Sequence, residues 1–176
     1  MKWITMTLLA LAVTLLPMSS TLSQNGNDSF GFNAELIHGF PTGAARLTGG
    51  GAYNLGKDFL KTGGGFRCLA DINQGPLNGC KAGEGVRWDA KEGATQLLES
   101  FPFKCTGAAT ETAKTAVTDD NTVVMLADFY RQGDGVNESF TAHMFVSEVD
   151  EAPDLPGIQN VWIEGVGCGE AIANFN

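Results

Sequence analysis

The chain has 176 residues, 43% of them apolar, with 20 acidic and 11 basic side chains and a formal net charge of −9. This length suits one domain with a core of its own, and the apolar content argues against intrinsic disorder. The acidic balance argues against a nucleic-acid partner, because neutralising phosphates requires clustered lysine and arginine.

Residues 1–23 have the pattern of an export signal. Lys2 supplies the positive start, and the apolar run 4–16 ends at Pro17, with small residues before a cleavage site expected after Ser23. The run is shorter than the roughly 20 apolar residues of a membrane-spanning helix, so we expect no membrane span after cleavage. An uncleaved anchor is the alternative. The sequence therefore predicts a secreted or periplasmic protein.

We expect residues 24–43 to hold an N-terminal tail and the first strand, and residues 44–176 to form a β domain. Early in that domain the pattern Thr-Gly-Gly-Gly occurs twice, in residues 48–53 and again in residues 62–67. Two strands joined by a turn around residues 54–58 explain this spacing. A phosphate-binding glycine loop is the alternative, but the Gly-Lys-Ser/Thr signature and a following helix are missing.

One short helix is expected, over residues 90–100. Asp89 can cap its N-terminus, and Glu92 stands three residues later in the capping-box position. Gly93 inside the segment costs about 1 kcal/mol relative to alanine, so we expect no more than a turn or two.

From residue 121 onward the pattern is that of β-strands. Residues 122–130 are rich in β-branched and aromatic side chains, a polar turn follows, and residues 139–147 return as the second strand of a hairpin. Alternate residues of the returning strand share one face, which we expect in the core. They are Phe140, Ala142, Met144 and Val146.

Residues 160–166 and 171–175 form a last pair of strands after a proline-bearing loop. About eight short strands at regular turn spacing predict an all-β fold. We expect a single antiparallel β-barrel or β-sandwich domain with at most one short helix.

All four cysteines follow the export signal, an even number in a chain sent to an oxidising compartment, so two disulfides are expected. Three pairings are open. We favour Cys68–Cys80, across a turn-rich segment, and Cys105–Cys168, which joins the middle of the chain to its last strand. Each would stabilise the fold by about 3 to 4 kcal/mol.

Five motifs are spread over the chain: GGGFRC (63–68), GVRWD (85–89), FKCTG (103–107), ADFYR (127–131) and GVGCG (165–169). Together they resemble an uncharacterised family of small secreted bacterial proteins, over residues 44–175. The resemblance implies export and β architecture. No activity is established for that family, so the resemblance implies no site.

Catalytic and metal-binding patterns are weak. His38 and His143 have no partner at metal-ligand spacing, and neither accompanies a Gly-x-Ser-x-Gly segment. Calcium at Asp119–Asp120–Asn121 or Asp134–Gly135 competes with ordinary turn formation. We expect no metal and no cofactor.

Paired carboxylates are the stronger enzyme hypothesis, because a glycosidase needs two acids close together. The acids around the 122–147 hairpin are numerous, although solvated surface charge explains most of them. They are Asp128, Asp134, Glu138, Glu148 and Glu164.

Binding is the remaining class of function. Amphipathic aromatics and arginines are typical of ligand clefts and interfaces, and the tryptophans alternatively belong to the core. The candidate binding residues are Arg67, Arg87, Trp88, Tyr130, Arg131 and Trp162. We therefore expect a non-catalytic ligand-binding or interaction module whose partner is a small molecule, a glycan or a protein. The alternative is a small secreted hydrolase that uses paired carboxylates.

Overall fold

The computed structural model describes residues 26–91, 96–133 and 137–176, and the expected export signal lies outside these ranges. Eight strands form a closed antiparallel β-barrel. They are β1 (Asp28–Gly39), β2 (Ala44–Asn54), β3 (Phe59–Ala70), β4 (Arg87–Ala90), β8 (Thr122–Tyr130), β9 (Phe140–Ser147), β10 (Val161–Ile163) and β11 (Gly167–Phe175).

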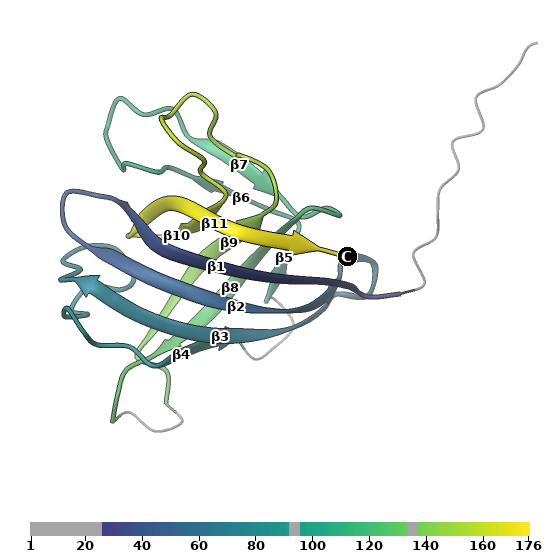
Figure 1. The fold of residues 1–176 in the computed structure, drawn as a ribbon, viewed down its shortest axis with the longest axis horizontal. Coiled ribbons are helices and arrows are strands. Elements are labelled where there is room, and N and C mark those ends of the chain that lie inside the picture. Colours follow the sequence, from purple (N-terminus) through teal and green to yellow (C-terminus); the bar gives the residue numbers. More distant parts are fainter. Residues whose placement is uncertain (1–25, 92–95, 134–136) are drawn as a thin grey trace, which may run out of the picture.

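The barrel is a meander in which each strand pairs with its neighbours in chain order. Figure 1 shows β1 to β4 as one curved layer, with β8 and β9 crossing behind it. β11 returns to pair with β1, and β4 pairs with β8 from Arg87 opposite Tyr130 to Ala90 opposite Ala127, which closes the cylinder. The prediction of an all-β fold is confirmed, and of the two alternatives the fold is a barrel.

The two glycine repeats lie on neighbouring strands, as the sequence predicts, with a short 3-10 turn at Leu55–Lys57 between them. Gly49 is opposite Gly64, and Gly50 is opposite Gly63. A Cβ on Gly64 would lie 1.9 Å from the carbonyl oxygen of Thr48. The repeats therefore let the two backbones curve closely past each other.

The barrel interior is packed with side chains. Trp88 is 1% exposed, and its indole nitrogen donates a hydrogen bond to the Thr48 carbonyl at 2.9 Å. Gly49 makes room for this ring, because a Cβ there would lie 2.7 Å from Cζ2 of Trp88. Near the chain termini Phe30 and Phe175 stack with ring centres 5.6 Å apart.

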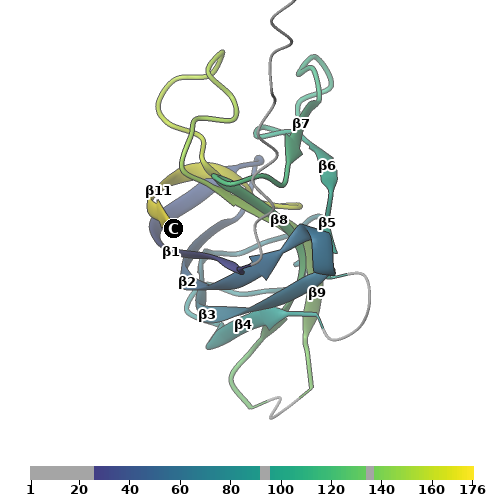
Figure 2. The same cartoon turned by 90° about the vertical axis from the view of Figure 1, so that its right-hand side faces the viewer.

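A small second sheet covers part of the outer wall. It consists of β6 (Ser100–Phe103) and β7 (Lys114–Val117), and β5 (Leu97–Leu98) leads into it along the edge of β8. Figure 2 shows β6 and β7 standing beside the barrel, on the same side as the loop that precedes β10. Trp162 of β10 is buried beneath them, and its indole donates to the Lys104 carbonyl at 3.0 Å.

Both expected disulfides are confirmed. Cys105–Cys168 ties the end of the β6 segment to β11, and Cys68–Cys80 closes the loop that follows β3. That loop inserts Ile72 and Leu77 into one end of the barrel, where both side chains are fully buried. We call this the plugged end.

The helix expected at residues 90–100 is not found in the part of that segment that the structure describes. Ala90 ends β4, Leu97–Leu98 form β5 and Ser100 begins β6, while residues 92–95 lie outside the described ranges. Pairing with β8 outweighs the local helix propensity of this segment, because Leu97 lies opposite Met125 and is buried in the core. Among the described residues no helix is long and apolar enough to cross a membrane.

Candidate functional site

Because the interior is packed, the candidate sites lie on the outer surface. The first is a groove of about 630 Å³ between β1, β11 and the loop that precedes β10. Three exposed aliphatic side chains line it: Leu36 is 46%, Ile158 45% and Ile172 74% exposed. We call this the apolar groove.

Acidic and hydrogen-bond-accepting groups border the apolar groove. Glu35 and Glu170 line it, and no lysine or arginine is among its described lining residues. The side-chain nitrogen Nδ2 of Asn33 donates a hydrogen bond to the Glu35 carboxylate at 3.0 Å. The side-chain oxygen Oδ1 of Asn33 is buried without a hydrogen-bond partner. Glu35 also forms an ion pair with Arg46 at 2.9 Å, whereas Glu170 has no ion pair among the described residues.

A second groove, of about 640 Å³, lies on the outer face of β2 and β3, beside the segment that leads into β4. Arg46 of β2 and Arg67 of β3 are directly opposite each other and both line it. Gly65 leaves its floor open, because a Cβ there would meet only the Thr48 hydroxyl, at 3.1 Å. We call this the arginine groove.

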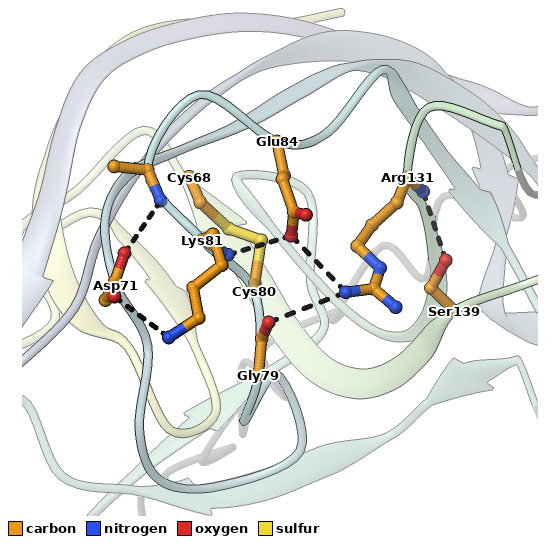
Figure 3. Close-up of polar contacts among 9 residues, drawn as sticks. Cys68, Asp71, Gly79, Cys80, Lys81, Glu84, Arg131 and Ser139 are labelled. Atoms are coloured by element: carbon orange, nitrogen blue, oxygen red, sulfur yellow. Dashed lines mark hydrogen bonds and ion pairs between the residues drawn. A yellow bond between two sulfur atoms is a disulfide. The ribbon is translucent and has the colours of Figure 1, made fainter.

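The remaining two arginines have partners near the plugged end. Arg87 lies over the ring of Tyr130, with its guanidinium carbon 4.1 Å from the ring centre. Arg131 points into the disulfide loop and ion-pairs with Glu84 at 3.3 Å, as Figure 3 shows. Arg131 therefore joins the loop of the Cys68–Cys80 disulfide to the end of β8.

Two carboxylates of the disulfide loop are also held by this network (Figure 3). Asp71 accepts from the backbone amide of Ala82 and from the Lys81 ammonium, and these contacts lower the pKa of Asp71. Glu84 accepts from the backbone amide of Lys81 and from Arg131, and the pKa of Glu84 is lowered too, chiefly by the backbone bond. The contacts explain how an exposed loop keeps one conformation.

A pair of carboxylates lies where the barrel closes, and one of them, Asp128, is buried. Asp89 of β4 is directly opposite Asp128 of β8. Tyr130 donates its hydroxyl to Asp89 at 3.0 Å, and Thr141 donates to Asp128. Partial burial, together with the bond to Asp89, raises the pKa of the Tyr130 hydroxyl. Of the five acids that the sequence analysis names as candidates for paired carboxylates, only Asp128 belongs to this pair. Asp134 lies outside the described residues.

The two histidines are far apart. His143 stacks on Phe101 of β6 with ring centres 3.8 Å apart and contacts the Glu164 carboxylate at 2.7 Å. His38 lines the apolar groove. His143 is thus held on β9 between an aromatic ring and a carboxylate.

The Asp119–Asp120 turn lies in a third, smaller groove of about 260 Å³ with Asp28 and Tyr53. Tyr53 donates its hydroxyl to the Asp119 carbonyl at 2.6 Å, and burial together with the three aspartates raises the pKa of Tyr53 well above its usual value. Among the described residues no group of three or more His, Cys, Asp or Glu has metal-binding geometry.

The six candidate binding residues therefore lie at different places and do not form one site. Arg67 lines the arginine groove, Arg87 and Tyr130 stack just beyond it, and Arg131 braces the disulfide loop. Trp88 and Trp162 are buried on opposite sides of the barrel wall, in the packing role that the sequence analysis gives as the alternative.

Sequence reasoning missed Arg46 and the whole apolar groove. Arg46 had a usable signal, because an antiparallel hairpin centred on residues 54–58 places it opposite Arg67. Leu36 and Ile172 had none, since only the pairing of β1 with β11 brings them to the same groove.

No protein-family model, no curated protein and no solved structure matched this chain.

Proposed function

We propose that the chain is an exported, non-catalytic interaction module that binds an extended segment of another protein in the apolar groove. The observation that carries this proposal is a groove of about 630 Å³ with three exposed aliphatic side chains, on a barrel whose interior is filled. Contiguous exposed apolar surface with a polar rim is typical of interaction sites.

The charge around the groove selects the partner. Glu35 and Glu170 line the groove, and no lysine or arginine is among its described lining residues. A lysine or arginine of a partner can pair with such carboxylates through charge-assisted hydrogen bonds. The partner segment therefore has aliphatic side chains alternating with lysine or arginine, and strand-like alternation suits the strands that form the groove.

Binding is tested by NMR titration with two probes, the peptides acetyl-Lys-Val-Lys-Val-Lys-amide and acetyl-Glu-Val-Glu-Val-Glu-amide. The lysine peptide should give saturable shifts at the amides of Leu36, Ile158 and Ile172, and the glutamate peptide should not. Ile172→Thr should weaken binding about fivefold, because an aliphatic contact worth roughly 1 kcal/mol is lost.

The matched control is Val117→Thr, a similar change at an exposed position on β7, outside the groove. It should leave the affinity unchanged. Equal shifts with both peptides, or shifts centred elsewhere on the barrel, would contradict the proposal.

Export is part of the same proposal and has its own test. The chain, expressed with its own leader in a bacterial host, should be recovered outside the cytoplasm with a mass that corresponds to cleavage after Ser23. Four thiols should react only after reduction, because both disulfides are formed. Uncleaved protein retained in the cytoplasm would refute export.

The hydrolase remains the second candidate, because Asp89 and Asp128 are directly opposite each other. Both acids already accept side-chain hydrogen bonds, and neither lines a described groove. This hypothesis predicts turnover of chromogenic glycosides that is lost in both Asp89→Asn and Asp128→Asn. The interaction module predicts no turnover in any of the three proteins.

A further inference from the structure

The arginines of this acidic chain are gathered at one end of the barrel. Arg46 is near the start of β2, Arg67 near the end of β3, and Arg87 begins β4, while Arg131 directly follows β8. Because these strands are antiparallel, all four positions lie at the plugged end. The chain has no other arginine.

Three of these arginines face outward on adjacent strands. Arg46 is directly opposite Arg67, and Arg87 is opposite Gly65, two residues before Arg67 on β3. Directly opposed side chains on a sheet have Cβ atoms about 5 Å apart, and diagonal neighbours are about 7 to 8 Å apart. The guanidinium groups therefore come from one continuous patch of the wall.

The patch is only partly neutralised, although the chain has 20 acidic residues. Arg46 has one ion pair, with Glu35 at 2.9 Å. Arg67 is exposed and has no carboxylate partner among the described residues. Like charges directly opposite each other on a sheet are destabilising, so the stability of the barrel does not account for this pair.

The surroundings of Arg46 and Arg67 suit a small ligand. Their groove has a volume of about 640 Å³, with the Thr48 hydroxyl and the Gln132 amide as further polar groups. Gly65 keeps the floor open, and the exposed side chains of Leu69 and Val86 add apolar wall.

We propose that the arginine groove is a binding site for an oxyanion. Guanidinium groups bind phosphate, sulfate and carboxylate through paired, charge-assisted hydrogen bonds. Such an anion satisfies Arg67, relieves the repulsion between Arg67 and Arg46, and accepts a further hydrogen bond from Thr48. The arginine groove is distinct from the apolar groove, because the two share no lining residue, although the Arg46–Glu35 ion pair joins one lining to the other.

The test is an NMR titration of the exported protein with inorganic phosphate, sulfate and acetate, each at constant ionic strength made up with chloride. We expect saturable shifts at the amides of Thr48, Gly65, Val86 and Gln132. Arg67→Gln should weaken binding of the preferred anion at least about tenfold, the usual effect of losing a charge-assisted hydrogen bond. The ranking of the three anions identifies the ligand's anionic group.

The matched control is Lys61→Gln, which removes the same charge from an exposed position on the same strand. Lys61 lies six residues, or about 20 Å along the strand, from Arg67. The anion affinity of the Lys61→Gln variant should stay within about twofold of that of the original protein, as expected for screened charges at this distance. Equal weakening by both variants would show a general attraction to the barrel and overturn the site, as would an unchanged affinity in Arg67→Gln.

Thermal unfolding without added anion separates binding from folding. Arg67→Gln should unfold at the same or a slightly higher temperature, because the repulsion with Arg46 is removed. A marked loss of stability would assign Arg67 a structural role and contradict the proposal. Peptide binding in the apolar groove should be unaffected by this variant, so the two proposals fail separately.

Discussion

At the scale of single residues, the glycine repeats show why neighbouring glycines are not equivalent. Gly64 and Gly65 of β3 both lack a Cβ atom, and both pair with β2. An added methyl group on Gly64 would meet backbone atoms of β2, whereas one on Gly65 would meet only the hydroxyl of Thr48. One position permits close strand packing, and the other keeps a surface open.

Gly64→Ala should therefore destabilise the barrel strongly. The new Cβ would lie 1.9 Å from the Thr48 carbonyl oxygen and 2.5 Å from the Gly49 Cα, so β2 and β3 must separate. We expect a loss of about 3 kcal/mol, at the upper end of overpacking effects. Gly65→Ala should cost less than about 1 kcal/mol. Urea unfolding of both variants checks this, and equal stability losses would contradict it.

At the scale of elements, the accuracy of the sequence analysis depends on how many residues carry each pattern. The hairpin of β8 and β9 was predictable because β-branched and aromatic residues fill one strand, a polar turn follows, and the second strand alternates. The alternate residues Phe140, Ala142, Met144 and Val146 indeed face the core. The structure of residues 90–100 was not predictable in this way, because the few residues that favour a helix there count for less than the pairing of Leu97 with β8. Short segments take the structure that their neighbours impose.

The Cys105–Cys168 disulfide should hold the β6–β7 sheet on the barrel. Cys105→Ala with Cys168→Ala should cost about 4 kcal/mol, because the bond closes a long loop, against about 3 kcal/mol for Cys68→Ala with Cys80→Ala. In the first variant the indole N–H of Trp162 should exchange faster with solvent, since its partner Lys104 adjoins Cys105. The indole of Trp88, inside the barrel, is the internal control and should stay protected.

The disulfide loop should also make stability pH-dependent. The pKa values of Asp71 and Glu84 are lowered in the folded state, so their contacts stabilise above the unfolded pKa near 4. This contribution is lost as the pH falls through the lower folded values. Asp71→Asn with Glu84→Gln should be less stable than the original at pH 7 and should approach it at about pH 2. Denaturant unfolding across this range measures the difference.

The control for this loop is Glu148→Gln, which removes an exposed carboxylate without an ion pair in the described part of the chain. Its stability should follow that of the original protein throughout. A constant difference between the loop variant and the original at all pH values would mean that the contacts do not depend on ionisation.

At the scale of the whole molecule, a net charge of −9 opposes compaction. Sodium chloride should therefore raise the unfolding temperature at pH 7, because it screens the repulsion between carboxylates. The effect should vanish near pH 4.5, the isoelectric point of the sequence, where the net charge is close to zero. Salt titrations at both pH values test this, and an equal rise at each would identify a general salt effect instead.

The amino-acid sequence by itself determined the all-β class and most strand positions, and among three possible disulfide pairings it favoured the one that the structure has. Alternation, turn residues and cysteine spacing act over short stretches of chain, so they can be recognised without knowing the fold. Only the tertiary structure decided that the strands close into a barrel, that Trp88 lies inside it, and that Leu36 and Ile172 line one groove. These neighbours are set by strand register and by contacts between distant segments, because a side chain's partners on a curved wall depend on every strand between them.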